Sequence, residues 1–295
     1  MVMTTNQIGI LSGIIAALIW SGFILVSRLG GISELTPYDV IAVRYITCAL
    51  LVTPIWWLHW RNKPFDKRLI FASLIGGVIY AVFAFQGFSQ APASHAAALL
   101  PGLMPFFIIV LAYFVNNERA SRQQWLGVFI ITLGIGLLLM PLWFSQAFTL
   151  GHGYFIAAAL CWSLFSVLVK RWNISPWQVT ISLAYVTCVV YLPVYWLFLP
   201  KAISWSAWES VAIQAFYQGV LASIVQVVFY VKAVQSIGPS SMGALMAMVP
   251  FISGISAIFV FDEPATLSLI IGLTLVSGGA WFAHSRLVKR RCFGQ

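Results

Sequence analysis

The chain has 295 residues, of which 61% are hydrophobic and only 8% are charged, with a formal net charge of +9. Soluble domains carry about 25% charged residues, so this composition excludes a soluble enzyme or binding domain and indicates a polytopic membrane protein. The basic residues lie in short loops between apolar runs. Membrane topology therefore explains the positive charge better than a nucleic-acid partner does.

Apolar runs of around 20 residues, each long enough to cross a hydrocarbon core of roughly 30 Å, recur along the whole chain. An open sheet cannot satisfy its backbone in lipid, and the alternation needed for a barrel is absent, so we predict helices. The ten predicted spans are 7–28, 37–59, 68–90, 93–115, 122–140, 151–171, 176–199, 207–235, 238–261 and 264–285.

The N-terminal MVMTTNQ lacks the basic stretch of a secretory signal, so we expect the first run to be retained as a helix. Cationic loop residues concentrate on one side of the predicted topology, which places both termini in the cytoplasm. On that side lie Arg61, Lys63, Lys67, Arg68, Arg119, Arg122, Lys170, Arg171, Arg286, Lys289, Arg290 and Arg291. The cysteines Cys48, Cys161, Cys188 and Cys292 show no disulfide or metal spacing, and we expect no metal or cofactor.

The sequence repeats itself with an offset of 145 residues. Pro105–Gly134 and Pro250–Gly279 both begin with Pro-Phe and share a Glu and two Gly at matching positions. The landmarks of the two copies are Pro105, Glu118, Gly127 and Gly134, and Pro250, Glu263, Gly272 and Gly279. Such a repeat indicates that the chain is built from two similar structural units. We expect the first unit in residues 1–145 and the second in residues 146–295.

The match extends to the first span of each half, where Trp20-Ser21 corresponds to Trp162-Ser163. Five spans per half is an odd number, so the second half enters the membrane in the opposite direction. Inverted repeats of this kind build many secondary transporters, with the substrate site between the repeats near the membrane midplane.

The repeated landmarks have structural interpretations. Glu118 and Glu263 are expected to satisfy amide groups where spans 5 and 10 begin. The paired glycines, two helical turns apart, allow helix backbones to approach closely, so spans 5 and 10 are read as packing helices. Pro105 and Pro250 make spans 4 and 9 easy to bend.

Ten spans in two inverted halves, each ending in the P…E…G…G pattern, resemble the drug/metabolite transporter superfamily, specifically its EamA-type exporters. The resemblance covers almost the whole chain, and within that group the chain looks like a YddG-type exporter of aromatic amino acids. It implies an all-α membrane protein with ten transmembrane helices in two inverted five-helix EamA-like repeats, both termini cytoplasmic. It also implies alternating access around a central cavity.

One departure concerns energy coupling. The related small multidrug-resistance proteins carry a glutamate in their first span, eight residues before a basic residue. The matching positions here, counted back from Arg28 and Lys170, hold Trp20 and Trp162. All seven acidic residues lie near span ends, so transport is expected to be uncoupled or coupled without a buried carboxylate.

Polar and aromatic residues in the middle of spans are candidates for substrate binding. Each has a structural alternative, either helix packing or an interhelical hydrogen bond, which the sequence leaves open. Tryptophan prefers the membrane interfaces, so a tryptophan in the middle of a span needs an explanation. A buried side-chain amide is unfavourable unless it is hydrogen-bonded to protein or to water. The substrate-binding candidates are Trp20, Ser21, Tyr80, Phe83, His95, Trp162, Ser163, Gln218, Gln226 and Tyr230.

Arg44 lies about two turns into span 2, and Leu183 fills the matching place in span 7. It is expected either to snorkel or pair with Asp39 or Glu34, or to bind a substrate carboxylate, for which its fork geometry is suited.

These patterns favour a multi-pass transporter of the bacterial inner membrane that exports aromatic or hydrophobic amino acids or related metabolites. The alternatives are transport of drugs, phosphorylated sugars or nucleotide precursors, and a non-transport intramembrane protein. No catalytic constellation is present in the sequence, so an enzyme is not expected. The expected partners are a small-molecule substrate and lipid but no nucleic acid, and the fused halves favour a monomer.

Overall fold

The computed structural model describes residues 4–59, 66–144 and 147–293, without the side chains of 59, 142, 239, 240, 244 and 284–293. Arg61 and Lys63, and the side chains of Arg286, Lys289, Arg290 and Arg291, therefore lie outside the described part. The described residues form helices and no strand.

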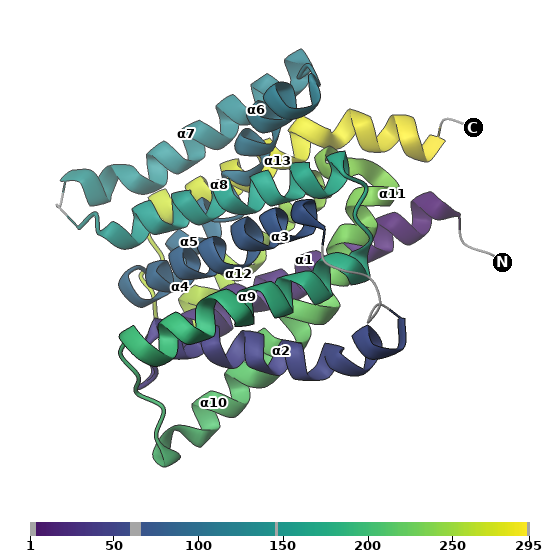
Figure 1. Cartoon of the computed structure of the whole chain (residues 1–295). Helices are drawn as coiled ribbons and strands as arrows, with labels where there is room; N and C mark the ends of the chain where they lie inside the picture. Colours follow the sequence, from purple (N-terminus) through teal and green to yellow (C-terminus); the bar gives the residue numbers. More distant parts are fainter. Residues whose placement is uncertain (1–3, 60–65, 145–146, 294–295) are drawn as a thin grey trace.

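The helices follow one another with short connections (Figure 1). In chain order they are α1 (Thr5–Gly31), α2 (Pro37–His59), α3 (Lys67–Ser73), η1 (Leu74–Ile79), α4 (Tyr80–Gln90), α5 (Ala93–Leu99), α6 (Met104–Asn116), α7 (Arg122–Phe144), α8 (Leu150–Arg171), α9 (Pro176–Phe198), η2 (Trp205–Ala207), α10 (Trp208–Gln214), η3 (Ala215–Val225), α11 (Gln226–Met246), α12 (Met248–Val260) and α13 (Leu267–Phe293).

Within the described residues, nine helical segments are long and apolar enough to cross a membrane, and Leu267–Ala283 forms a shorter apolar helix. The predicted multi-pass helical membrane protein is therefore confirmed, whereas ten spans and cytoplasmic termini stay predictions. The start of α1 and the end of α13 lie on the same side of the bundle (Figure 1).

Local sequence determines where several helices begin. Thr4 and Gln7 form a capping box at α1, in which each side chain satisfies the other residue's backbone N–H. Ser175 and Gln178 do the same at α9, where Pro176 occupies the first turn, a position that needs no N–H donor.

Irregular helices occupy matching places in the two halves. The third span contains the π-helix η1, and the eighth contains the π-helix η3. The fourth span breaks between Leu99 and Met104, and the ninth breaks at Ala247. Each break lies just before the repeated proline, Pro105 or Pro250. Broken and π-helical segments are frequent at functional sites and in transporters.

The two halves interlock along their length. Helix α1 of the first half packs along α11 of the second, and α8 of the second packs along α4 and α6 of the first. Helices α2 and α9 also pack together, as do α5 and α12. The interior is therefore built mainly from contacts between halves, so it lies where a site between inverted repeats is expected.

The repeated glycines lie face to face where α7 packs on α13. A Cβ on Gly127 would lie 2.6 Å from the carbonyl oxygen of Gly279, and one on Gly134 would lie 2.9 Å from that of Gly272. The contacts are reciprocal, at 2.9 Å in both cases. Glycine at these four positions lets the two backbones touch, as small residues do between helices in lipid.

We predict that Gly279→Ala lowers the apparent melting temperature of the detergent-purified protein by several degrees. The new Cβ would meet backbone oxygen and the Ile130 side chain at 2.9–3.0 Å, and such overpacking costs about 1–3 kcal/mol. Gly278→Ala is the matched control, because its Cβ meets no atom within 4 Å. Equal melting temperatures for the two variants would contradict this account of the α7–α13 contact.

Candidate functional site

Four aromatic rings meet at the centre of the molecule, two from each half. The rings of Trp20 (α1) and Trp162 (α8) meet edge to face, with centroids 5.0 Å apart and planes at 80°. Tyr80 (α4) contacts Trp162 at 4.8 Å, and Tyr230 (α11) contacts both indoles at 5.9 and 5.7 Å. These distances are typical of favourable aromatic pairs. The tryptophans that match in the repeat are thus in direct contact across the interface between the halves.

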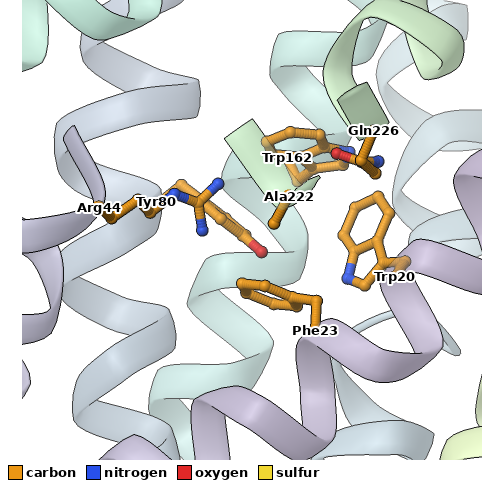
Figure 2. Close-up of a pocket in the computed structure, with 7 residues that line it drawn as sticks. All are labelled: Trp20, Phe23, Arg44, Tyr80, Trp162, Ala222 and Gln226. Atoms are coloured by element: carbon orange, nitrogen blue, oxygen red, sulfur yellow. The ribbon is translucent and has the colours of Figure 1, made fainter. Parts of the chain in front are cut away.

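All four side chains are at most 2% exposed, and three of them, Trp20, Tyr80 and Trp162, line a small central cavity. Figure 2 shows its lining residues, with the Arg44 guanidinium and the Tyr80 hydroxyl directed toward the shared space. The cavity volume is about 10 Å³, room for roughly one water molecule. The lining residues are Trp20, Phe23, Arg44, Tyr80, Trp162, Ala222 and Gln226.

The π-helical segments position two of these residues. Tyr80 directly follows η1, and Gln226 directly follows η3. A π-helical turn holds one more residue than an α-helical turn, so it shifts the residues after it around the helix axis. The same irregularity in both halves therefore presents a polar side chain to the cavity from each.

Hydrogen bonds fix the ring cluster in place. The hydroxyls of Ser166 and Tyr230 lie 2.8 Å apart, and Ser166 also donates to the carbonyl of Trp162 at 2.7 Å. Ser21 donates to the carbonyl of Ala17 in its own helix, and Ser163 makes a long bond of 3.5 Å to the carbonyl of Met104. Neither of these two candidate serines lines the cavity.

Arg44 is buried, with only 3% of its surface exposed. Its guanidinium carbon lies 5.4 Å from the ring centre of Phe23, 5.3 Å from that of Tyr45 and 5.9 Å from that of Phe85. These distances fit cation–π contacts. Its hydrogen bond to the Oε1 of Gln218 is long, at 3.4 Å.

No carboxylate in the described part of the chain forms an ion pair with Arg44. Asp39, the nearest acid on the same helix, accepts from the Tyr195 hydroxyl at 2.6 Å with one oxygen. Its other oxygen accepts from the backbone and hydroxyl of Thr36 and from the amide of Ala202, at 2.8–3.0 Å. Within the described part of the chain, Lys170–Glu118 is the only ion pair. The expectation that Arg44 pairs with Asp39 or Glu34 is therefore wrong, because Asp39 holds the end of α9 and its following loop instead.

Four residues that line the cavity have a buried polar atom without a hydrogen-bond partner. These atoms are Nε1 of Trp20, Nε1 of Trp162, Nε of Arg44 and Nε2 of Gln226. Each is a nitrogen that donates. Buried polar groups are nearly always paired, so four unpaired donors among the seven residues that line one cavity make it the candidate binding site.

The structure brings together only some of the predicted site residues. Trp20, Tyr80, Trp162 and Gln226 line the cavity. Tyr230 contacts both indoles without lining the cavity, and Gln218 contacts Arg44. Phe83 and His95 lie elsewhere. The ring of Phe83 stacks on Tyr154, with centroids 6.1 Å apart, and Nδ1 of His95 lies 3.1 Å from Nε2 of His152.

Sequence reasoning did not place Phe23 and Ala222 at the site, and it did not group Arg44 with the tryptophans. Phe23 is three residues after Trp20 in α1, so helical spacing alone would have found it. Ala222 lies in η3, whose π-helical geometry has no sequence signal of that kind.

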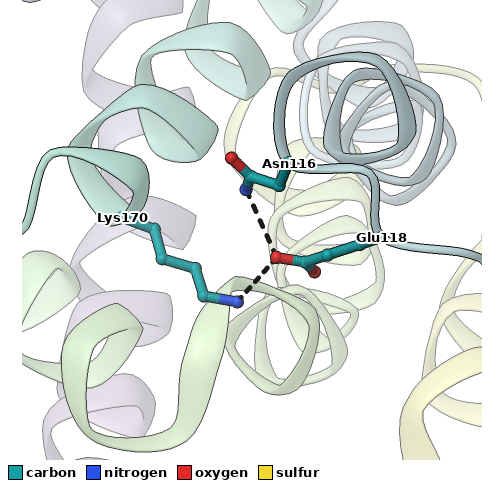
Figure 3. Close-up of polar contacts among 3 residues, drawn as sticks. All are labelled: Asn116, Glu118 and Lys170. Carbon is teal, nitrogen blue, oxygen red and sulfur yellow. Dashed lines mark hydrogen bonds and ion pairs between the residues drawn. The ribbon is translucent and has the colours of Figure 1, made fainter.

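The two repeated glutamates make different contacts. The carboxylate of Glu118 accepts from Nζ of Lys170 at 3.1 Å and from Asn116 at 3.3 Å (Figure 3). Glu263 accepts from the backbone amides of Ala93 and Ser94 at 2.7 and 2.9 Å. The expectation that each satisfies amides at its own span 5 or 10 is therefore corrected. Glu263 caps α5 of the other half, and Glu118 binds side chains.

We predict that Glu263→Gln lowers the apparent melting temperature. A neutral amide has one acceptor oxygen in place of two and loses the attraction to the helix N-terminus, at a cost of about 1–2 kcal/mol. Asp262→Asn is the matched control, since it removes the neighbouring charge at a position with φ 51°, which asparagine tolerates. If both variants melt like the parent protein, the cap does not stabilise the contact between halves.

Comparison with known proteins identifies the architecture. Residues 7–140 and 149–284 each match the EamA-like transporter family. This chain belongs to that family. It is thus a membrane transporter of the drug/metabolite transporter superfamily, with one EamA unit in each half.

Several transporters are similar in sequence to this EamA protein. An S-adenosylmethionine uptake transporter of Rickettsia felis is 24% identical over 83% of this chain and 81% of its own length. An uncharacterised transporter of Archaeoglobus fulgidus is 21% identical over 91% of this chain and 94% of its own. A solved crystal structure covers 97% of this chain and 99% of its own, with 20% identity and a TM-score of 0.65, which shows the shared fold.

These names support the EamA family but give no support to the narrower YddG-type subgroup that the sequence suggested. The substrate that they name for the Rickettsia protein is a metabolite taken up, and not an aromatic amino acid exported.

Proposed function

We propose that this EamA protein carries small metabolites with an amino-acid head group across the bacterial inner membrane by alternating access. The observation that carries the proposal is the central cavity, which both halves enclose with matching tryptophans and which holds unpaired donors. Binding sites between inverted repeats are the rule in secondary transporters.

The cavity volume of about 10 Å³ is far below the 300–1,000 Å³ typical of ligand pockets. A substrate can therefore enter only when helices from the two halves separate. The helix breaks before Pro105 and Pro250 offer places for this bending, and the first of them contacts α8 through the hydrogen bond from Ser163 to the Met104 carbonyl. In alternating access, this interface between the two halves then opens first on one side of the membrane and afterwards on the other.

Export of aromatic or hydrophobic amino acids is the first candidate activity. Five of the seven residues that line the cavity have aromatic or aliphatic side chains, which suit an apolar substrate side chain. The Arg44 guanidinium suits the carboxylate. Deeply buried acids are absent from this lining, so a cation without a carboxylate finds no counter-charge there.

Transport of S-adenosylmethionine is the second candidate activity, favoured by the names of the Rickettsia relatives. This molecule has the same amino-acid head group, and its sulfonium is a cation that aromatic faces attract. The two candidates share the head group and differ in the rest of the substrate and in direction.

We expect purified protein in proteoliposomes to exchange labelled substrate when tested with a panel of aromatic, aliphatic and charged amino acids and S-adenosylmethionine. Trp20→Ala and Trp162→Ala should each reduce saturable exchange at least tenfold, because each removes a wall of the cavity. Trp196→Ala is the matched control, since that side chain is 69% exposed on the outside of α9.

The substrates exchanged decide between the candidate activities, and inside-out and right-side-out vesicles decide the direction. We further expect that an imposed pH or sodium gradient drives no uphill accumulation. Exchange of none of these compounds by folded protein would contradict the proposal. Full activity in both central tryptophan variants would contradict the assigned place of the site.

A further inference from the structure

We infer that Arg44 recognises the carboxylate of the substrate, assisted by the indole N–H groups of Trp20 and Trp162. This deepens the proposed function and rests on it, since it names the substrate class of the same site: metabolites with a free carboxylate. It also gives the site a fixed orientation, because the position that matches Arg44 in the second half is Leu183.

The first argument is charge. A guanidinium inside a membrane protein is costly unless an anion or polar groups compensate for it. The described acid nearest in sequence, Asp39, is fully engaged with Tyr195, Thr36 and Ala202. The aromatic rings around Arg44 make cation–π contacts with the faces of its guanidinium. The Gln218 oxygen, at 3.4 Å, is an uncharged acceptor. Among the described residues, no acidic side chain therefore balances the charge of the guanidinium.

The second argument is the polarity of the unpaired atoms. Besides Nε of Arg44, both central indoles have an N–H that makes no well-formed hydrogen bond, although the Tyr230 hydroxyl lies beside that of Trp162. Indole and guanidinium nitrogens donate and never accept. A carboxylate brings two oxygens with about four acceptor positions, so it supplies what these three side chains lack. An ammonium group would bring further donors and leave all three unpaired.

The third argument is that Arg44 is held in position. Gln218 contacts it and donates in turn to the hydroxyl of Ser27 at 3.0 Å. Gly219 brings η3 against α2, because a Cβ there would lie 3.2 Å from the carbonyl oxygen of Arg44. The guanidinium is thus fixed between α1, α2 and η3, which suits a recognition role better than the exposed position of a snorkelling arginine.

The experiment uses pairs of compounds that differ only in the carboxylate. Binding to detergent-purified protein is measured by thermal shift and by quenching of tryptophan fluorescence. The pairs are phenylalanine with phenethylamine, and S-adenosylmethionine with its decarboxylated form. 3-Phenylpropanoate, which keeps the carboxylate and lacks the amine, completes the set. Exchange in proteoliposomes is measured in parallel.

We expect the carboxylate of at least one pair to improve binding about ten- to a hundredfold, as a hydrogen bond between charged groups does. Arg44→Gln should bring this ratio close to one by weakening the carboxylate member alone. Arg44→Lys should restore part of it, because it keeps the charge but not the fork. Trp20→Phe should lower the ratio by removing one N–H while keeping a ring. Lys201→Gln, at the end of α9, is the control that should leave the ratio unchanged.

The outcomes separate the inference from the proposed function. Exchange that is equal for both members of a pair, or a ratio that survives Arg44→Gln, overturns the role of Arg44 and leaves transport intact. Carboxylate-dependent binding that requires Arg44, without any exchange, supports the role of Arg44 and contradicts transport of these compounds. Absence of binding by every carboxylate in the set overturns the inference. A ratio, unlike a melting temperature, does not change when a variant merely loses stability.

Discussion

The edge-to-face contact between Trp20 and Trp162 joins the two halves at the centre of the molecule. It is the constraint on which the proposed transport depends, because the cavity that the two indoles line, about 10 Å³, is too small for a metabolite. In the proposed function, the two indoles separate before a substrate enters and rejoin when it leaves. An edge-to-face contact of this kind contributes about 0.5–1.5 kcal/mol beyond its buried area, so it favours the closed arrangement only modestly.

The inverted repeat provides a symmetric frame, and a few residues make it asymmetric. Paired glycines fix α7 against α13 outside the central cluster, and the π-helical segments present one polar residue from each half. Arg44 against Leu183, and Glu263 on backbone amides against Glu118 on Lys170, break this symmetry. In the proposed function, the symmetry allows the interface between the halves to open on either side of the membrane. The asymmetry allows the site to hold one end of a substrate in a defined direction.

Much of this arrangement was predictable from the sequence, because lipid restricts what an apolar segment can do. Apolar run length indicated the helices, and the repeat matched Trp20 with Trp162. The π-helices were not predictable, since no propensity encodes an extra residue in a turn. The contacts of Arg44 and Glu263 could not be predicted from the sequence either. Asp39 is close to Arg44 in sequence but bonds to α9, and Glu263 caps a helix 170 residues away. Such contacts depend on tertiary packing.

The most direct test of this account is a structure of the protein determined with a transported substrate bound. The account predicts that the substrate lies between Trp20 and Trp162, with a carboxylate oxygen within about 3 Å of the Arg44 guanidinium and the rest of the molecule against the aromatic rings. A substrate bound outside the seam between the halves, or one whose amine faces Arg44 while its carboxylate contacts other residues, would contradict it.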